Sequence, residues 1–250
     1  MRAETRHQLK QDRFSKVTLE AAENAAHWSV EHQSKLIAAA IAVAVIAAIG
    51  FGGWYYVNTQ DEKASAELST AVRTFETPVR PAGVPAQPGF ESFASPEERA
   101  TAARKQFKEI VDRYPHTHTA DMARYFVGLT SEQLGDNAAA ASNLEQVTNS
   151  SNKDLAALGK FALASVYRSE PGRGKVPGSH DALVIDLYKQ LIDKPTLVVS
   201  KATAQFELAG FYESQQKPDE AKRIYDQVEK DNPASEVGSM AQRRASALKQ

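Results

Sequence analysis

Few side chains in this sequence have the types and spacing that metal or acid–base chemistry requires. His116 and His118 with Asp121 come nearest to a ligand set. Two histidines separated by one residue, in the turn before a predicted helix, match no known ligand spacing by themselves. We therefore interpret them as exposed turn residues and predict no metal site.

Other kinds of chemistry are excluded by what the sequence lacks. The chain has no cysteine, which removes disulfides, thiolate metal sites and a cysteine nucleophile. It has no P-loop, no Gly-x-Ser-x-Gly, no His-Glu-x-x-His and no Gly-x-Gly-x-x-Gly pattern. A net charge of −1 gives no electrostatic reason for nucleic acid binding. We predict no catalytic residue, no cofactor and no nucleic acid partner.

The segment around which the chain is organised runs from Leu36 to Val57, 22 residues without a charge. As a helix it would be about 33 Å long, enough for a hydrocarbon core of about 30 Å. Trp54, Tyr55 and Tyr56 stand together at its end, where amphipathic rings favour the headgroup layer. A buried core helix is rarely apolar on every face, and a cleaved signal peptide has a shorter apolar core. We therefore predict a single transmembrane helix over residues 36–57.

The charges on the two sides of this segment predict its orientation. Residues 1–35 carry six Lys and Arg residues, and the equal window 58–92 carries three. By the positive-inside rule the N-terminus is cytoplasmic, and residues 58–250 lie on the opposite side of the membrane. A short amphipathic helix is also expected before the span, because apolar residues recur there at helical spacing. These residues are Phe14, Val17, Ala21, Ala25 and Trp28.

A helical stretch and a proline-rich break follow the span. Residues 61–76 have helical composition with no glycine or proline, whereas residues 77–95 contain four prolines. Proline at this density prevents a helix and favours an extended, exposed loop. Ser95, followed by Pro96 and then Glu98, is typical of a helix start with a capping box.

From residue 103 onward the sequence repeats one pattern four times. Each copy has a small or β-branched residue, a bulky residue four positions later and an apolar residue three positions further. The first and last copies then end on Pro115 and Pro233. A second set of helices, each with a large–small pair, precedes the last three copies. The bulky residues are Phe107, Leu144, Tyr188 and Tyr225, and the pairs are Val127-Gly128, Leu163-Ala164 and Leu208-Ala209.

This pattern resembles the tetratricopeptide repeat, in which helix A has a large–small pair and helix B has alanine, an aromatic residue and a terminal proline. The resemblance implies an all-α fold, with the transmembrane helix followed by a tetratricopeptide-like α-solenoid of about four helix pairs. Residues 236–249 would form a C-terminal capping helix. The chain departs from the pattern where Arg124, Lys160 or Gln205 replaces the tryptophan, and in an insertion at residues 170–179.

The whole arrangement also resembles a narrower bacterial family, the YfgM-type ancillary subunits of the SecYEG translocon. The matching features are a short tail, a span ending in Trp-Tyr-Tyr, the sequence RKQFKEIVDRYPHT at residues 104–117, and Gly135-Asp136 before a B helix. The resemblance implies an inner-membrane protein with a periplasmic repeat domain over residues 58–250. It implies as partners the translocon, periplasmic chaperones or exported polypeptide. The proline-rich loop and the 170–179 insertion depart from the shorter family pattern.

When the three A helices are placed in register, matching residues form columns. In the repeat family these columns face the concave groove, where chaperone-tail binders use lysine and asparagine to hold a carboxylate. Here one column is aromatic, so we expect extended or apolar polypeptide as the ligand instead. The sequence leaves open whether these rings line a groove or stack as core between repeats. The predicted protein-binding residues are Tyr125, Leu129 and Glu132, then Phe161, Ser165 and Arg168, then Phe206 and Glu213. Gly210 occupies in the third helix the position that Leu129 and Ser165 occupy in the other two.

The function implied by these resemblances is non-enzymatic: a membrane-anchored protein-interaction scaffold at the export machinery. One alternative is a scaffold of an envelope or cell-wall assembly complex. The other is an envelope enzyme whose active residues lie in the long loops. A convergent polar pocket with perturbed carboxylates or histidines would favour the enzyme.

Overall fold

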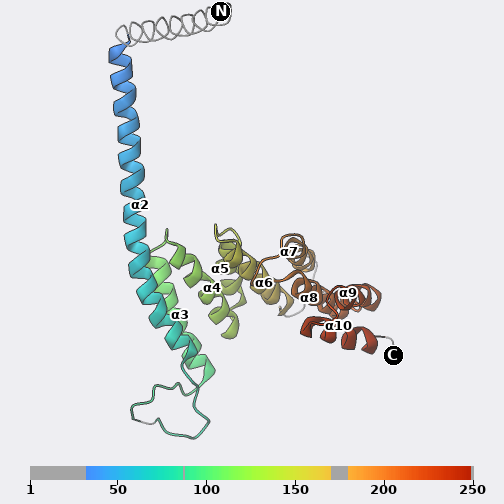
Figure 1. Cartoon of the computed structure of the whole chain (residues 1–250). Coiled ribbons are helices and arrows are strands. Elements are labelled where there is room, and N and C mark those ends of the chain that lie inside the picture. The colour runs from blue at the N-terminus through green and yellow to red at the C-terminus, as the bar shows by residue number, and fades with distance from the viewer. Residues whose placement is uncertain (1–31, 87, 170–179, 249–250) are drawn as a thin grey trace, which may run out of the picture. The chain divides into compact units, whose positions relative to one another are not determined.

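The computed structural model describes residues 32–86, 88–169 and 180–248. Their regular structure is α-helical apart from one isolated bridge between Val79 and Phe93, which confirms the all-α fold class (Figure 1). The predicted amphipathic helix over residues 14–28 and the insertion at 170–179 lie outside the described residues. The helices are α2 (Gln33–Glu76), α3 (Pro96–Arg113), α4 (His118–Gln133), α5 (Asn137–Val147), α6 (Lys153–Ser169), α7 (Asp181–Asp193), α8 (Lys201–Ser214), α9 (Pro218–Asp231) and α10 (Glu236–Ala247).

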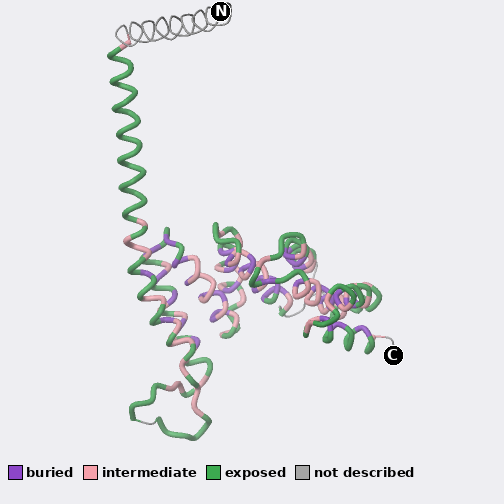
Figure 2. Tube along the Cα trace, in the orientation of Figure 1, coloured by how far each residue is buried: buried purple, intermediate pink, exposed green. Residues whose placement is uncertain are grey.

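The first part of α2 is apolar and exposed. The chain divides into two compact units, and the boundary between them, between Tyr56 and Val57, falls inside this helix. The most apolar 18-residue window of α2 has a mean hydropathy of 2.5 and no buried residue, as Figure 2 shows. This helix is therefore long and apolar enough to cross a membrane.

The second part of α2 belongs to the other unit, where it packs against α3. Ala64 and Ala71, seven residues apart and so on one face of the helix, are buried in a cluster with Phe107 of α3. Between them Glu67 accepts a hydrogen bond of 2.8 Å from the hydroxyl of Tyr114. This part of α2 is therefore the A helix of the first pair, which the sequence pattern did not assign.

The polar residues that end the apolar stretch do not end the helix. Helical conformation continues from Val57 through Asn58, Gln60 and Asp61 to Glu76. Because no glycine or proline follows Gly53 before residue 77, nothing in the backbone opposes this continuation. The predicted helix over residues 61–76 is confirmed, as the end of a longer helix rather than as a separate one.

The proline-rich loop between α2 and α3 is non-helical in its described residues and closed at its base. The backbone N–H of Arg80 donates to the carbonyl of Phe93, and that of Phe93 donates to the carbonyl of Pro78, both at 3.0 Å. Beyond the loop α3 begins where predicted. The N–H of Glu98 donates to the side-chain oxygen of Ser95 at 3.1 Å, so Ser95 is the N-cap.

From α3 onward each helix packs against the next one in the chain, and α10 packs against both α9 and α8. The A helix α4 also contacts α6, the A helix of the following pair. The pairs α2/α3, α4/α5, α6/α7 and α8/α9, ended by α10, form the predicted solenoid. In such a stack each pair buries its apolar face against its neighbours.

Large residues of the B helices fit against small residues of the A helices. A Cβ placed on Gly128 of α4 would lie 2.5 Å from Cγ of Leu144 in α5, which is fully buried. Ala221 and Tyr225 of α9, predicted to be core contacts, are 0% and 1% exposed. The predicted burial of the last B helix is therefore confirmed.

Candidate protein-binding surface

Three A helices carry the residues predicted to bind protein. The aromatic row, which we define as Tyr125, Phe161 and Phe206, has one ring on each of α4, α6 and α8. All three rings are half-buried. Four residues after each ring comes the middle column, and three residues later comes the polar row, so the columns share one face of each helix. The middle column is Leu129, Ser165 and Gly210, and the polar row is Glu132, Arg168 and Glu213.

Each ring of the aromatic row packs against the core on one side. Phe161 meets Tyr188 of α7 edge-on at 6.1 Å between ring centroids, and Phe206 meets Tyr225 of α9 at 5.3 Å. Tyr125 packs against the same core cluster as Phe161. Among the described residues, the ring partners of these three residues lie outside the aromatic row. The rings are therefore neither stacked between repeats nor free in solvent, and each retains an exposed part.

The polar row connects neighbouring helices. The Ser165 hydroxyl of α6 donates to the carboxylate of Glu132 in α4 at 3.2 Å. The guanidinium of Arg168 lies 3.1 Å from the Tyr188 hydroxyl and 2.5 Å from the carboxylate of Glu207 in α8. These side chains therefore hold adjacent repeats in register as well as lining the surface.

A hollow of about 390 Å³ brings part of the predicted site together at the C-terminal repeats. Arg168, Phe206 and Glu213 line it, whereas Tyr125, Leu129, Glu132, Phe161 and Ser165 do not. Inside it Glu213 accepts a 3.1 Å hydrogen bond from the Tyr225 hydroxyl and lies 3.5 Å from the Arg244 guanidinium. The remaining lining residues are Glu207, Gly210, Ser214, Tyr225 and Arg244.

Sequence reasoning missed two charged residues of this hollow. Glu207 lies one residue after Phe206, in a column where the other A helices have Phe126 and Ala162. The three side chains at this position share no chemical property, so aligning the repeats gave no reason to predict Glu207 as a binding residue. Arg244 comes from the capping helix α10, which has no counterpart in the other repeats. An ion pair across repeats leaves no signal in the spacing of one repeat.

Burial changes the proton affinities of several groups on this face. It raises the pKa of the Tyr188 hydroxyl, and it raises that of Tyr225 further, with the nearby Glu213 carboxylate adding to the effect. Burial also raises the pKa of the Glu132 carboxyl, and the hydrogen bond from Ser165 opposes the change. Both tyrosines stay neutral at neutral pH, so they act as hydrogen-bonding groups.

His116, in the turn before α4, and His118, the first residue of α4, do not lie in a ligand set within the described residues. Asp121 accepts a hydrogen bond of 2.9 Å from the Ser150 hydroxyl and pairs with Arg124 at 3.0 Å. The described residues contain no group of three or more side chains able to hold a metal ion. The carboxylate of Asp121 therefore joins α4 to the segment before α6.

Together these features define a class of protein: a helical-repeat module whose A helices present half-exposed rings and paired charges. The chain belongs to the family described as tetratricopeptide repeat-like domain, whose pattern matches residues 12–172. Residues 203–235 match a tetratricopeptide repeat. No curated protein and no solved structure matches the chain. Such repeats indicate a protein–protein interaction scaffold and are typically non-enzymatic.

Proposed function

We propose that this protein is a membrane-anchored interaction scaffold, an ancillary subunit of the protein export translocon. The apolar part of α2 is its single transmembrane anchor, with the N-terminal segment in the cytoplasm and residues 58–250 in the periplasm of a bacterial cell. The repeat domain holds translocon subunits, periplasmic chaperones or emerging polypeptide, and it performs no turnover.

One observation carries this proposal. The helix α2 has an 18-residue apolar window with no buried residue, and its later residues Ala64 and Ala71 are built into the first repeat. An apolar helix that no protein surface covers needs an apolar solvent, which a bilayer supplies. The family match begins at residue 12, before the apolar window, so the family pattern itself includes this helix.

The aromatic row supports polypeptide as the bound ligand. Each ring is held by core contacts on one side and presents apolar surface on the other, as aromatic anchors of protein interfaces do. Arg168 and Glu213 are already paired with Glu207 and Arg244, and Glu132 accepts a hydrogen bond from Ser165. These side chains therefore contribute polar rim contacts rather than a clamp for a single charge.

Topology is tested with reporters fused after Gln250. We expect a reporter active only outside the cytoplasm to be active and one active only inside it to be silent. The reverse result would contradict the proposed orientation.

Binding is tested by purifying the full chain in mild detergent and identifying co-purifying proteins by mass spectrometry. We expect Phe161→Ser and Phe206→Ser each to lose partners while the domain stays folded by circular dichroism. Phe90→Ser is the matched control, because Phe90 is 74% exposed in the proline-rich loop, outside the aromatic row. Folded row variants that retain every partner would reject the aromatic row as the binding surface.

A further inference from the structure

A second surface of the repeat domain lies on a different face of α6 from the aromatic row. Two hollows, of about 400 and 520 Å³, lie along α6 and α7 and share Lys160 and Gln190 in their walls. We call these two hollows together the lysine groove. Its residues on α6 follow helical spacing along one side of that helix, and so do its residues on α7. They are Lys153, Ala156, Ala157, Lys160 and Leu163 on α6, and Leu183, Leu187, Gln190, Leu191 and Lys194 on and just after α7.

Over the described residues that form its walls, the lysine groove carries more positive than negative charge. Lys153, Lys160 and Lys194 line it, and their ammonium groups form no ion pair or hydrogen bond with the part of the chain that the structure describes. Among the described residues that line it, Glu145 is the one carboxylate. Glu145 already accepts a 2.6 Å hydrogen bond from the Tyr167 hydroxyl. This surface therefore differs from the polar row, where the cationic Arg168 is paired with the carboxylate of Glu207.

Apolar and polar residues both line the groove between the lysines. Leu163, Leu187 and Leu191 are almost fully buried beneath it, whereas Leu183 of α7 is 37% exposed, and Pro195 continues the groove beyond α7. Lysine side chains beside such exposed apolar groups keep their ammonium groups in water, where they attract an anionic ligand that also has apolar groups.

An exposed apolar turn continues from the end of this groove. Thr196 lines the groove, and the next residue, Leu197, is 98% exposed. The N–H of Thr196 donates to the carbonyl of Val199 at 3.0 Å, and the N–H of Val199 donates to the Thr196 hydroxyl at 3.2 Å. Val199 is buried in the core, so the turn presents Leu197 from a fixed base.

We infer that the lysine groove is a second protein-docking site, and that its ligand is an extended acidic segment of a partner protein with leucine-like side chains between its carboxylates. The unpaired lysines select the acidic groups, and the exposed Leu183 and Leu197 select the side chains between them. A flat anionic membrane would meet the lysines, but it would leave the two hollows beside them unfilled.

The test measures fluorescence anisotropy of a labelled peptide of alternating Glu and Leu against the full chain in detergent micelles. We expect saturable binding that weakens as salt increases, because screening reduces the attraction between exposed charges. The variant with Lys153, Lys160 and Lys194 all changed to Glu should bind at least about tenfold more weakly. The corresponding triple change to Gln should weaken binding less, because it removes charge without reversing it.

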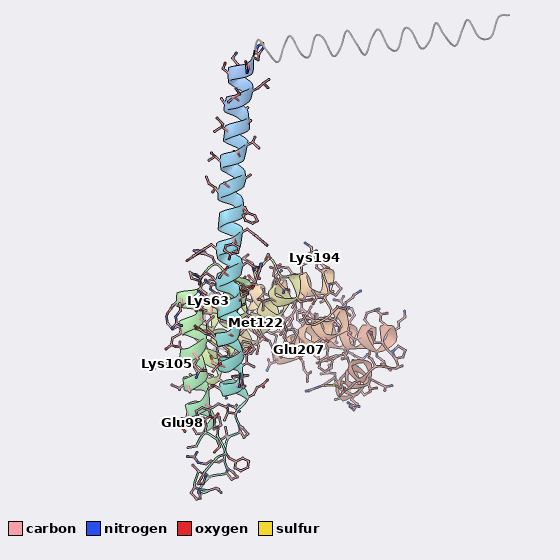
Figure 3. All side chains as sticks on the ribbon, turned by 60° about the vertical axis from the view of Figure 1, so that its left-hand side comes forward. Lys63, Glu98, Lys105, Met122, Lys194 and Glu207 are labelled. Carbon is pink, nitrogen blue, oxygen red and sulfur yellow. The ribbon has the colours of Figure 1, made fainter. Side chains whose placement is uncertain are left out.

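The matched control changes Lys105, Lys201 and Lys230 to Glu, which alters the net charge equally at exposed sites outside the groove. Figure 3 shows Lys105 on α3, well apart from Lys194. The control should bind as the unchanged chain does. Equal weakening in both triple variants, unchanged binding in the groove variant, or no binding of this peptide at all would each overturn the inference.

An anionic lipid is the competing ligand, and the test is retention of phosphatidylglycerol by the full chain and its variants after purification in detergent, because the apolar part of α2 would carry every variant into vesicles. Groove lysines that are needed for lipid retention and not for peptide binding would assign the surface to lipid and overturn the inference. Circular dichroism of every variant confirms that the fold is kept. Phe161→Ser and Phe206→Ser should leave peptide binding unchanged, which separates this site from the aromatic row.

Discussion

The A helices α4, α6 and α8 present two sides that differ in what they tolerate. On the core side, Gly128, Ala164 and Ala209 are buried, and a side chain larger by one carbon meets a neighbour at Gly128. On the other side, the aromatic and polar rows are half-exposed: the rings pack against the core on one side only, and the polar side chains form hydrogen bonds and ion pairs.

This difference shows which residues keep the repeat fold and which remain available for recognition. Interiors are close-packed, so small changes of volume on the core side are costly. Changing a half-exposed side chain lowers the free energy of unfolding less, because that side chain buries less surface and has fewer neighbours. Substitutions on the two sides should therefore separate stability from binding.

The largest expected effect on stability comes from removing a side chain that packs in the core. Tyr225→Ala should lower the free energy of unfolding by about 3–5 kcal/mol, since the ring is almost fully buried and its hydroxyl bonds to Glu213. Phe206→Ala, which removes the half-exposed ring that packs on Tyr225, should cost clearly less. Denaturant unfolding of the full chain in micelles measures both. Equal losses of unfolding free energy in the two variants would contradict the proposed difference between the two sides.

Two glycines allow the same change to be made on each side. Gly128→Ala should cost about 1–3 kcal/mol, because its new Cβ would lie 2.5 Å from Leu144, which is buried and cannot move away. Gly210→Ala meets the Tyr225 hydroxyl at an ordinary 3.4 Å and should stabilise the helix by up to about 1 kcal/mol. Melting temperatures that move in the same direction in both variants would contradict the packing described for α4 and α8.

The ion pairs of the polar row should contribute less than the core. Glu207→Gln, which keeps the shape of the side chain and removes its charge, should cost about 1 kcal/mol through the loss of its pair with Arg168. Asp112→Asn is the control, because Asp112 and Lys108 form a more exposed pair within one helix. Its effect should stay within about 0.5 kcal/mol. High salt should reduce the difference between the two variants.

The smallest expected effect concerns Glu132 and depends on pH. Burial raises its folded-state pKa, so its carboxyl favours folding at low pH and this contribution is lost as pH rises through that value. Glu132→Gln keeps an acceptor for Ser165 and removes the titration. The variant should therefore gain stability relative to the unchanged chain from about pH 4 upward, by a few tenths of a kcal/mol because the site is half-exposed. Thermal unfolding at a series of pH values measures this, and a gap that narrows as pH rises would contradict the assigned direction.

Features with a local signal could be predicted from the sequence. The N-cap at Ser95 follows from three neighbouring residues, and the turn before α5 follows from Gly135, whose φ is +75°, with Asp136 as the next N-cap. The buried B-helix residues followed from their repeated spacing. In each case the residues that determine the structure lie within one or two helical turns.

Features that depend on pairing between distant residues could not be predicted in this way. The contact of Glu207 with Arg168 joins residues 39 positions apart, and Arg244 reaches Glu213 across 31. Leu197 and Val199 are apolar residues two positions apart and of similar size, yet one is exposed and the other buried. Only the hydrogen-bonded turn between α7 and α8 decides which of them faces the core.

The order in which the helices pack has a consequence for how the chain acquires its structure. From α3 onward each helix makes its contacts with helices close to it in sequence, so loop closure costs little entropy and folding is expected to be fast. The first cluster joins Ala64 and Ala71 to Phe107 and Val127, and it includes nothing beyond α4. A nascent chain can therefore complete this cluster while its C-terminal half is still being synthesised. Each later pair then folds against a surface that already exists.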